Sequence, residues 1–411
     1  MYEMGEQLER VILAGVQTYE SDDTVQSLYE LRELAETAGA VTVGTIMQSR
    51  ETIHPATYLG KGKLEELKEL LYDLDATGVI CDDELSPAQL NNLEQELECK
   101  VMDRTMVILD IFAQRAKTSE GKIQVELAQL KYRQSQLTGA GRAMSRLGGG
   151  IGTRGPGEKK LEMDRRLIRE RISRLKKELK DVERHRELIR GQRKQSGLKV
   201  AALVGYTSAG KSSIENALTQ AGVLEDAMLF STLDTTTRAL TLDNTQEILL
   251  TDTVGFINKL PHHLVEAFKS TLEEAKYADI IVHVVDASNP QMDAQMHVVY
   301  ETLRQLGAEG KPVITLFNKQ DKVENPVNHK DLQADYSIAT SAKTGQGLEE
   351  FKQALLEIIR KEQIYIERLY DFSEAGKIQL IRSKGQLLSE EYVPEGIEVK
   401  AYVPQDIYGR L

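Results

Sequence analysis

The chain has 411 residues, of which 41% are hydrophobic and 28% are charged, and its formal net charge at pH 7 is −12. This length exceeds what one hydrophobic core usually organises, so we expect two or three domains. The composition is that of an ordinary globular protein and excludes collagen-like or fully disordered chains. No apolar run approaches the roughly 20 residues that a membrane-spanning helix requires, so we expect no membrane insertion.

The N-terminus and the two cysteines bear on the cellular compartment of the protein. The first ten residues, MYEMGEQLER, have neither the basic start nor the apolar stretch of a secretion signal. Cys81 and Cys99 lack the spacing of a metal site, and we expect both to be buried structural thiols. A reducing compartment favours such thiols, so the sequence predicts a cytoplasmic protein. We expect it to be a monomer.

Positive charge is concentrated in one segment. Residues 141–196 contain 18 Lys or Arg against 8 Asp or Glu, a local charge of +10, so the rest of the chain carries −22. A single basic segment in an acidic protein is an asymmetry that the function has to explain.

The first hundred residues alternate between short apolar runs and amphipathic segments. We expect strands at residues 11–16, 41–47 and 78–81, and helices from Ser21, over 64–74 and from Ser86, which precedes a proline at the first turn. The first of these helices is expected to bury Val25, Leu28, Leu31 and Leu34. This alternation predicts a small α/β domain with a parallel sheet over residues 1–104.

Residues 105–197 are expected to form a helical hairpin. The pattern is helical from about Arg104 to Leu137, and residues 158–189 show a heptad repeat typical of a coiled coil. Its apolar positions are Leu161, Ile168, Ile172, Leu175, Leu179, Val182 and Ile189, and the upstream partner positions are Leu127, Leu130 and Leu137. A single long solvated helix is the alternative.

Eight glycines separate the two helical patterns. They are Gly139, Gly141, Gly148, Gly149, Gly150, Gly152, Gly155 and Gly157. Because each glycine costs about 1 kcal/mol relative to alanine in a helix, residues 139–157 are predicted to form a mobile, basic, non-helical tip. Residues 191–197 are predicted to be a linker to the next domain.

A phosphate-binding motif follows a predicted strand at residues 199–204. Gly205-Tyr-Thr-Ser-Ala-Gly-Lys-Ser212 matches G-x-x-x-x-G-K-S, between a strand and a helix that runs through Leu218. Glycines let backbone N–H groups surround phosphate oxygens, and the helix N-terminus adds its positive end. We expect Lys211 to bridge the terminal phosphates and the Ser212 hydroxyl to bind magnesium.

Two further elements predict a phosphate-sensing switch. A strand at residues 248–251 ends in Asp252-Thr-Val-Gly255, where Asp252 can hold magnesium through water and the Gly255 N–H can sense the terminal phosphate. The preceding loop, residues 230–238, must supply a threonine to complete the magnesium shell. Thr232 is the first choice and Thr236 the second. Spacing alone does not separate the two threonines. Lys211, Thr232 and Gly255 are therefore the expected catalytic residues.

The choice of base is predicted by two later motifs. A strand at residues 313–317 leads into Asn318-Lys-Gln-Asp321, and Ser341-Ala-Lys343 follows another short strand. The Asp321 carboxylate can accept hydrogen bonds from both the ring N–H and the amine of guanine, which favours GTP over ATP by about a hundredfold. Asn318 would reach the ring N7, Lys319 would stack along the base, and a backbone N–H of residues 341–343 would meet the guanine oxygen.

Together these motifs predict a magnesium-dependent GTP-hydrolysing domain at residues 198–362, with a doubly wound, mostly parallel sheet. The expected pocket comprises Gly205, Tyr206, Thr207, Ser208, Ala209, Gly210, Lys211, Ser212, Phe230, Ser231, Thr232, Leu233, Asp234, Asp252, Thr253, Val254, Gly255, Asn318, Lys319, Gln320, Asp321, Ser341, Ala342 and Lys343. After Gly255 stands Phe256, where Ras-like switches place a water-orienting glutamine. A phenylalanine cannot orient water, so we expect slow basal turnover that a partner stimulates.

Residues 363–411 lie beyond this domain. Strands are predicted at 365–370 and 397–403, with a helix over about 374–383. A small α+β C-terminal domain is expected.

Several motifs make the chain resemble the HflX family of translation-associated GTPases, over nearly its whole length. They are Tyr58-Leu-Gly-Lys-Gly-Lys63, the glycine-rich stretch 145–158, Phe230-x-Thr-Leu-Asp234, Asp252-Thr-Val-Gly-Phe-Ile257 and Lys259-Leu-Pro-His262. The resemblance implies a protein that binds the large ribosomal subunit and its RNA, and that splits stalled or idle ribosomes in its GTP form. It also implies that the N-terminal domain and the hairpin contact ribosomal RNA, which the basic segment can bind through counterion release.

The chain departs from the family pattern at two positions. Ser208 stands where members often carry an asparagine associated with a monovalent-cation site, and Thr235 stands where they often carry proline. Some members are reported to bind ATP through the N-terminal domain, but residues 1–195 hold no second phosphate loop beyond the weak candidate at residues 60–63. Two other functions remain open: a nucleotide-driven RNA-remodelling enzyme, and a coiled-coil adaptor with a vestigial site.

Overall fold

The computed structural model describes residues 8–19, 23–147, 156–196, 198–219, 229–230, 233, 236–243, 246–259, 269–323 and 329–411. The chain divides into two compact units. The first comprises residues up to Glu183 with two short segments, Ala227–Asp234 and Asn258–Lys269. The second comprises Arg184–Asp226, Thr235–Ile257 and Ser270–Leu411.

The first unit contains the predicted parallel sheet. Its strand order is β2-β1-β3-β4, and all three strand pairs are parallel. The strands are β1 (Arg10–Gln17), β2 (Val41–Ser49), β3 (Gly78–Cys81) and β4 (Lys100–Asp103), and the helices are α1 (Thr24–Thr37), α2 (Lys61–Asp73), α3 (Pro87–Leu97) and α4 (Arg104–Arg115). Strand β4 had no counterpart in the sequence prediction. Helix α3 starts at the predicted place and is capped by Ser86, whose side chain accepts from the Gln89 N–H.

Two predictions for this unit are only partly right. Leu28, Leu31 and Leu34 are buried as expected, but Val25 is 53% exposed. The buried stripe of α1 begins at Thr24 and continues through Ser27, and Val25 lies about 100° away from it around the helix. Cys81 is buried, whereas Cys99 is half-buried.

A buried polar cluster lies at the carboxyl ends of β3 and β4. The Arg104 guanidinium, which is 2% exposed, donates to Asp82 Oδ1 and to Ser27 Oγ, each over 2.9 Å. Lys259, from the segment Asn258–Lys269 of the same unit, pairs with Asp82 and with Asp83 at 2.8 Å. These cations lower the pKa of Asp82 against the effect of its burial, so the carboxylate stays ionised inside the unit.

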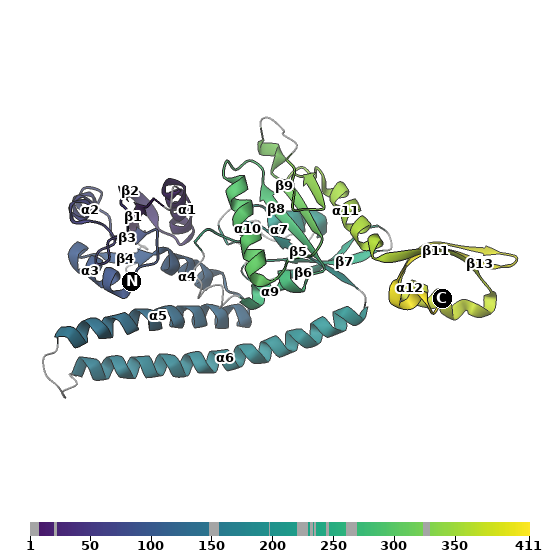
Figure 1. Ribbon diagram of the computed structural model, residues 1–411, viewed down its shortest axis with the longest axis horizontal. Coiled ribbons are helices and arrows are strands. Elements are labelled where there is room, and N and C mark those ends of the chain that lie inside the picture. Colours follow the sequence, from purple (N-terminus) through teal and green to yellow (C-terminus); the bar gives the residue numbers. More distant parts are fainter. Residues whose placement is uncertain are drawn as a thin grey trace, which may run out of the picture. The chain divides into compact units, whose positions relative to one another are not determined.

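The helical hairpin consists of α5 (Ser119–Leu147) and α6 (Pro156–Ser196), which lie side by side in Figure 1. The predicted seam is confirmed in its central part. Its packed residues are Ile123, Leu127, Leu130, Ile168, Ile172, Leu175 and Leu179. A bidentate contact between Arg171 and Glu126, at 2.6 and 2.7 Å, fixes the register of the two helices.

The helix ends differ from the prediction. Helix α5 continues through Gly139 and Gly141 to Leu147, and α6 begins at Pro156 and so includes Gly157. Residues 191–197 were predicted to be a linker, but α6 runs through Gly191 to Ser196. A long helix of good helix formers tolerates an isolated glycine, which costs about 1 kcal/mol. The rest of the predicted tip, residues 148–155, lies outside the described residues.

The second unit is built on a six-stranded sheet of order β10-β9-β8-β5-β7-β6, in which only the β6–β7 pair is antiparallel. The strands are β5 (Lys199–Val204), β6 (Thr236–Thr241), β7 (Glu247–Asp252), β8 (Ile280–Asp286), β9 (Val313–Asn318) and β10 (Tyr336–Ala339). The helices are α7 (Lys211–Thr219), α9 (Lys269–Tyr277), α10 (Met292–Leu306) and α11 (Leu348–Lys361), with a short 3-10 turn, η1 (Gln320–Lys322).

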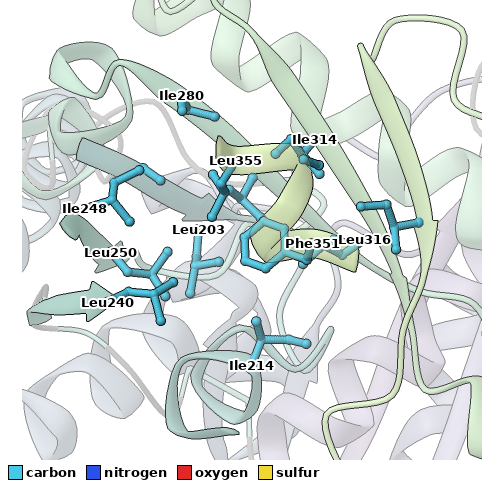
Figure 2. Packing of buried hydrophobic residues seen from close by; sticks show 14 of the residues in the cluster. Leu203, Ile214, Leu240, Ile248, Leu250, Ile280, Ile314, Leu316, Phe351 and Leu355 are labelled. Atoms are coloured by element: carbon cyan, nitrogen blue, oxygen red, sulfur yellow. The ribbon is translucent and has the colours of Figure 1, made fainter. Parts of the chain in front are cut away.

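This sheet is covered on both faces, as the doubly wound prediction requires. Figure 2 shows Ile214 of α7 with Phe351 and Leu355 of α11 among apolar residues of the strands, and these side chains form one buried core. Tyr300 of α10 packs edge-on against His283, a residue of β8 whose neighbours Val282 and Val284 point into that core. Helix α10 therefore covers the opposite face.

The C-terminal residues form an α+β structure of their own. An antiparallel sheet of order β11-β13-β12 packs against α12. Its elements are β11 (Gln363–Tyr370), η2 (Phe372–Glu374), α12 (Ala375–Lys384), β12 (Gln386–Val393), β13 (Gly396–Pro404) and α13 (Gln405–Tyr408). The two predicted strands and the helix are confirmed, and β12 is an addition. No helix in the described ranges combines the length and apolarity needed to cross a bilayer.

The hairpin seam yields a stability prediction. Leu175 is 1% exposed, so Leu175→Ala should cost about 2–5 kcal/mol of local stability, because it leaves a cavity between α5 and α6. Leu167 is 53% exposed on the same helix, and Leu167→Ala should change stability by less than about 0.5 kcal/mol. Hydrogen–deuterium exchange of residues 119–137 measures both. Equal protection in the two variants would contradict the packing described here.

Candidate nucleotide-binding site

The predicted phosphate loop, residues 205–212, joins the carboxyl end of β5 to the N-terminus of α7. Two of its positions require glycine. A Cβ on Gly205 (φ +154°) would lie 2.2 Å from the Val284 carbonyl oxygen, and one on Gly210 (φ +98°) would lie 2.3 Å from Asn318 Nδ2. Ser208 also has a left-handed backbone, at φ 58°. The loop thus closes tightly over the sheet edge, with its N–H groups at the start of a helix.

Lys211 is buried beneath this loop. Its Nζ donates to the carbonyl oxygens of Gly205 (3.2 Å) and Tyr206 (2.9 Å). Burial lowers the pKa of Lys211 to about 8, with the Asp252 carboxylate opposing the shift and Lys319 adding to it. The amine is therefore still mostly protonated at neutral pH and can pair with phosphate oxygens.

A hydroxyl and a carboxylate meet beside the lysine. Ser212 Oγ donates to Asp252 Oδ2 over 2.8 Å, and Asp252 is 1% exposed at the end of β7. Oxygen ligands of this kind suit a hard divalent cation such as Mg²⁺, which also keeps waters and substrate oxygens in its shell. Glu215, one helical turn beyond Ser212, is also buried. Its desolvation and the nearby Asp252 charge raise the pKa of Glu215 to about 7.

Phe256, which follows the Asp252–Gly255 motif, is hydrogen-bonded to the phosphate loop. The Thr207 N–H donates to the Phe256 carbonyl (2.8 Å), and the Phe256 N–H donates to the Gly205 carbonyl (3.1 Å). A Cβ on Gly255 would lie 2.9 Å from Thr207 Cα and 3.1 Å from Lys211 Nζ. Gly255 thus lies next to the phosphate-loop lysine. The Phe256 side chain is 1% exposed and packs in the interior.

The predicted switch loop is described only in part. Phe230 and Leu233 are buried, whereas Ser231, Thr232 and Asp234 lie outside the described residues. Thr236 and Arg238 were assigned to this loop, but they belong to β6 and pair with β7. The β-branched Thr235-Thr-Thr237 run favours a strand here. The Thr236 hydroxyl donates to Glu215 Oε2 over 2.9 Å.

The predicted base-binding residues meet at the ends of β9 and β10. Asn318 Nδ2 donates to the Ala209 carbonyl, and Asn318 Oδ1 accepts from the Ala342 N–H, each over 3.0 Å. Asn318 therefore joins the phosphate loop to residues 341–343, and its contact with the guanine N7 stays a prediction. The Ser341 hydroxyl donates to Asp321 Oδ1 (2.7 Å), which lowers the pKa of Asp321 and keeps that exposed carboxylate ionised.

Two residues near the site were not found from the sequence. Asp286 Oδ2 pairs with Lys319 Nζ at 2.6 Å, and Asp286 ends β8 beside Asn318 in register, a neighbour that the sequence alone does not show. Glu215 is the other. Its spacing of three from Ser212 on a helix places both side chains on the same face. The weaker ATP candidate, residues 60–63, begins α2, where the Gly60 N–H donates to Gln48 Oε1 (2.8 Å).

Comparison with known proteins gives consistent matches over most of the chain. Residues 25–113 match the family model described as GTP-binding GTPase N-terminal, residues 115–193 the GTP-binding GTPase Middle Region, and residues 200–319 the 50S ribosome-binding GTPase. The chain is 62% identical to the GTPase HflX of Lacrimispora saccharolytica over 411 residues, covering 100% of this chain and 97% of that protein. It is 39% identical to the GTPase HflX of Escherichia coli over 408 residues, covering 98% and 92%.

A solved structure is also similar. It is a GTP-binding protein of the archaeon Sulfolobus solfataricus in complex with GDP, with 25% sequence identity and a TM-score of 0.45. The match covers 86% of this chain and 99% of that one.

The glycine geometry yields a prediction. Gly210→Ala should weaken GDP binding at least a hundredfold, because its Cβ would meet Asn318 Nδ2 in a backbone conformation that alanine rarely adopts. Gly376→Ala is the matched control, since a Cβ there meets nothing within 4 Å and the residue lies in α12. Fluorescent-GDP titration of both variants measures the effect. Undiminished affinity in Gly210→Ala would contradict the loop geometry.

Proposed function

The chain belongs to the HflX family of GTPases and hydrolyses GTP, and from this premise we propose that it binds the large ribosomal subunit and dissociates stalled or idle ribosomes. The observation that carries the proposal is a basic hairpin attached to a GTP-hydrolysing domain. The match of residues 200–319 to a 50S ribosome-binding GTPase supports it. In this proposal the GTP-bound form acts in the cytoplasm, as a monomer.

The hairpin supports RNA as the partner. Helix α5 has 29 residues, which corresponds to about 44 Å at 1.5 Å per residue, so its end at Leu147 lies far from its start at Ser119. Residues 141–196, which include that end, carry a charge of +10 in a chain of net −12. Cationic side chains on a long projection can reach phosphates on an irregular RNA surface and gain affinity by releasing counterions.

Hydrolysis is proposed to use the residues at the carboxyl edge of β5 and β7. The 205–212 loop holds the phosphates, Lys211 neutralises the terminal phosphates, and the Gly255 N–H reports the third one. Ser212 and Thr232 would hold magnesium, with Asp252 acting through water. When bound, the ion offsets the negative charge that develops on the transferring phosphate. The geometry of Ser212 and Asp252 fits this role, because their oxygens already lie 2.8 Å apart in a buried site.

Selection of guanine is assigned to Asp321. Its ionised carboxylate is held by Ser341 and can accept two hydrogen bonds from the guanine edge. Lys319 would stack along the base, with Asp286 limiting its movement through the 2.6 Å pair. Residues 341–343 would offer an N–H to the guanine oxygen, and Asn318 would hold their loop beside the base.

Basal turnover is proposed to be slow. The residue after Gly255 is the buried Phe256, which has no polar group to orient an attacking water. The ribosome would then supply or arrange the missing contact. This is the feature that makes hydrolysis dependent on the partner.

The base pocket is tested by Asp321→Asn. The amide offers a donor where guanine also has a donor, so GTP should bind about a hundredfold more weakly, while xanthosine triphosphate should gain affinity. Asp293→Asn, an exposed change on α10, should alter neither. Competition against a fluorescent guanine nucleotide measures both. An unchanged preference for guanine would mean that the base pocket lies elsewhere.

The partner is tested by GTPase rates with purified large ribosomal subunits. We expect at least a tenfold stimulation in wild type. Replacing Arg142, Arg146 and Arg154 by Gln should reduce the stimulation and its salt dependence while leaving basal hydrolysis intact. The matched control is Lys330, Lys384 and Arg410 to Gln, which removes the same charge from exposed positions outside the basic segment and should leave the stimulation unchanged. No stimulation in wild type would instead favour a nucleotide-driven RNA-remodelling enzyme.

A further inference from the structure

The two carboxylate oxygens of Asp286, at the carboxyl end of β8, have separate partners. Its Oδ1 accepts from the backbone N–H (3.0 Å) and from the hydroxyl (2.6 Å) of Ser288, which closes the turn after the strand. Its Oδ2 accepts from Lys319 Nζ over 2.6 Å, a contact between positions 33 residues apart. One oxygen therefore shapes the local turn, and the other holds a side chain from a different strand end.

The backbone of Lys319 is fixed as well. It has φ 64° and ψ 33°, a left-handed conformation that residues other than glycine rarely adopt. The carbonyl of the preceding residue, Asn318, accepts from the Ala287 N–H, and its Nδ2 donates to the Ala209 carbonyl of the phosphate loop, each over 3.0 Å. These contacts fix the start of the Lys319 side chain, and the Asp286 carboxylate fixes its far end.

A lysine at this position has a competing place to go. Because Asn318 lies against the phosphate loop, the flexible four-carbon stem of Lys319 would let a loose ammonium move toward the phosphates of a bound nucleotide. Stability does not account for the ion pair with Asp286. Its side chains are 15% and 23% exposed, and ion pairs that water can reach add little to the stability of a fold. A stem that is ordered before the nucleotide arrives, however, lowers the entropy cost of binding.

We propose that Asp286 is a positioning residue that holds the stem of Lys319 against the face of the guanine ring. This inference rests on the proposed function of Lys319 in the base pocket, and Asp286, Ser288 and Lys319 all belong to the second compact unit. It divides recognition of the base into two parts: Asp321 reads the edge of the ring, and Lys319 covers its face. Every purine has such a face, so Asp286 contributes to affinity without contributing to the choice among purines.

The test compares GDP with inosine diphosphate, which has the same ring face but lacks the exocyclic amine of guanine. Asp286→Ala should bind both nucleotides about tenfold more weakly than wild type, and the ratio of the two affinities should stay within about twofold of the wild-type ratio. Asp321→Asn should change that ratio, because it alters the contact with the edge. A changed ratio in Asp286→Ala would overturn the proposal, as would unchanged affinity for both nucleotides.

Two further variants separate the ion pair from the turn. Asp286→Asn keeps an oxygen for Ser288 but removes the negative charge, so it should lose nearly as much GDP affinity as Asp286→Ala. Asn289→Ala is the matched control, because the Asn289 side chain accepts from the Gln291 N–H in the same loop over 2.8 Å. Its GDP affinity should stay within about twofold of wild type. Thermal unfolding of each variant confirms that it is folded. Full affinity in Asp286→Asn, or an equal loss in Asn289→Ala, would reduce Asp286 to a part of the turn and overturn the proposal.

A double-mutant cycle identifies the residue through which Asp286 acts. Lys319→Met keeps an unbranched apolar stem but has no ammonium for Asp286 to hold. In this background, Asp286→Ala should cause no further loss of GDP affinity. Two losses that add would show that Asp286 acts independently of Lys319, which would overturn the proposal.

The nucleotide preference of wild type separates the inference from its premise. Wild type should bind GDP about tenfold more tightly than inosine diphosphate, because the Asp321 carboxylate can pair with the exocyclic amine. Equal affinities in wild type would overturn the base pocket and the role of Asp286 with it. A clear preference for GDP in wild type, with GDP affinity unchanged in Asp286→Ala, would overturn the role of Asp286 alone.

Discussion

Main-chain approaches too close for a Cβ atom organise the carboxyl edge of the six-stranded sheet. Gly205 lies against the Val284 carbonyl, Gly210 against the Asn318 amide, and Gly255 against Thr207. These contacts bring together three loops that are far apart in the sequence. The nucleotide site proposed above depends on this convergence, because it is built from the phosphate loop, the Asp252–Gly255 turn and the segment that starts at Asn318.

The charged groups at this edge range from the buried Lys211 to the exposed Asp321, and both keep their charge. Lys211 keeps its proton despite burial because Asp252 is near, and Lys319 is held by Asp286. Asp321 is more exposed, and its hydrogen bond from Ser341 keeps it ionised. A triphosphate with a divalent ion would add charges of both signs to this site, and Lys211 and Asp321 already have the protonation states that the proposed GTP complex needs.

The sequence predicted the motifs well because each one is a short signal with a strict geometric reason. The phosphate loop, the Asp252–Gly255 turn and the doubly wound sheet are of this kind. The predictions from the sequence were wrong where several weak helix preferences compete along a long helix. Glycine content suggested that the helix pattern stops before Gly139 and at Gly191, but the flanking residues of α5 and α6 outweigh single glycines. The spacing of Glu215 from Ser212 places it on the same helix face, but its partner Thr236 and the partner of Asp286, Lys319, come from distant parts of the chain that spacing does not bring together.

Asn318 has a consequence for the order in which the protein is made. It bonds on one side to Ala209 and on the other to Ala342, so the base side of the pocket closes only after β9 and β10 have joined the sheet. When synthesis has just passed the phosphate loop, the chain must still grow by more than a hundred residues before it reaches Ser341–Lys343, the last segment of the proposed site. Strands β5 and β8 also pair in parallel with strands that come later in the chain. Their hydrogen-bond ladders therefore cannot be completed until those later strands have been made. With the base pocket assigned as proposed, a nascent chain can select guanine only after synthesis has passed β10 and the residues 341–343 that follow it.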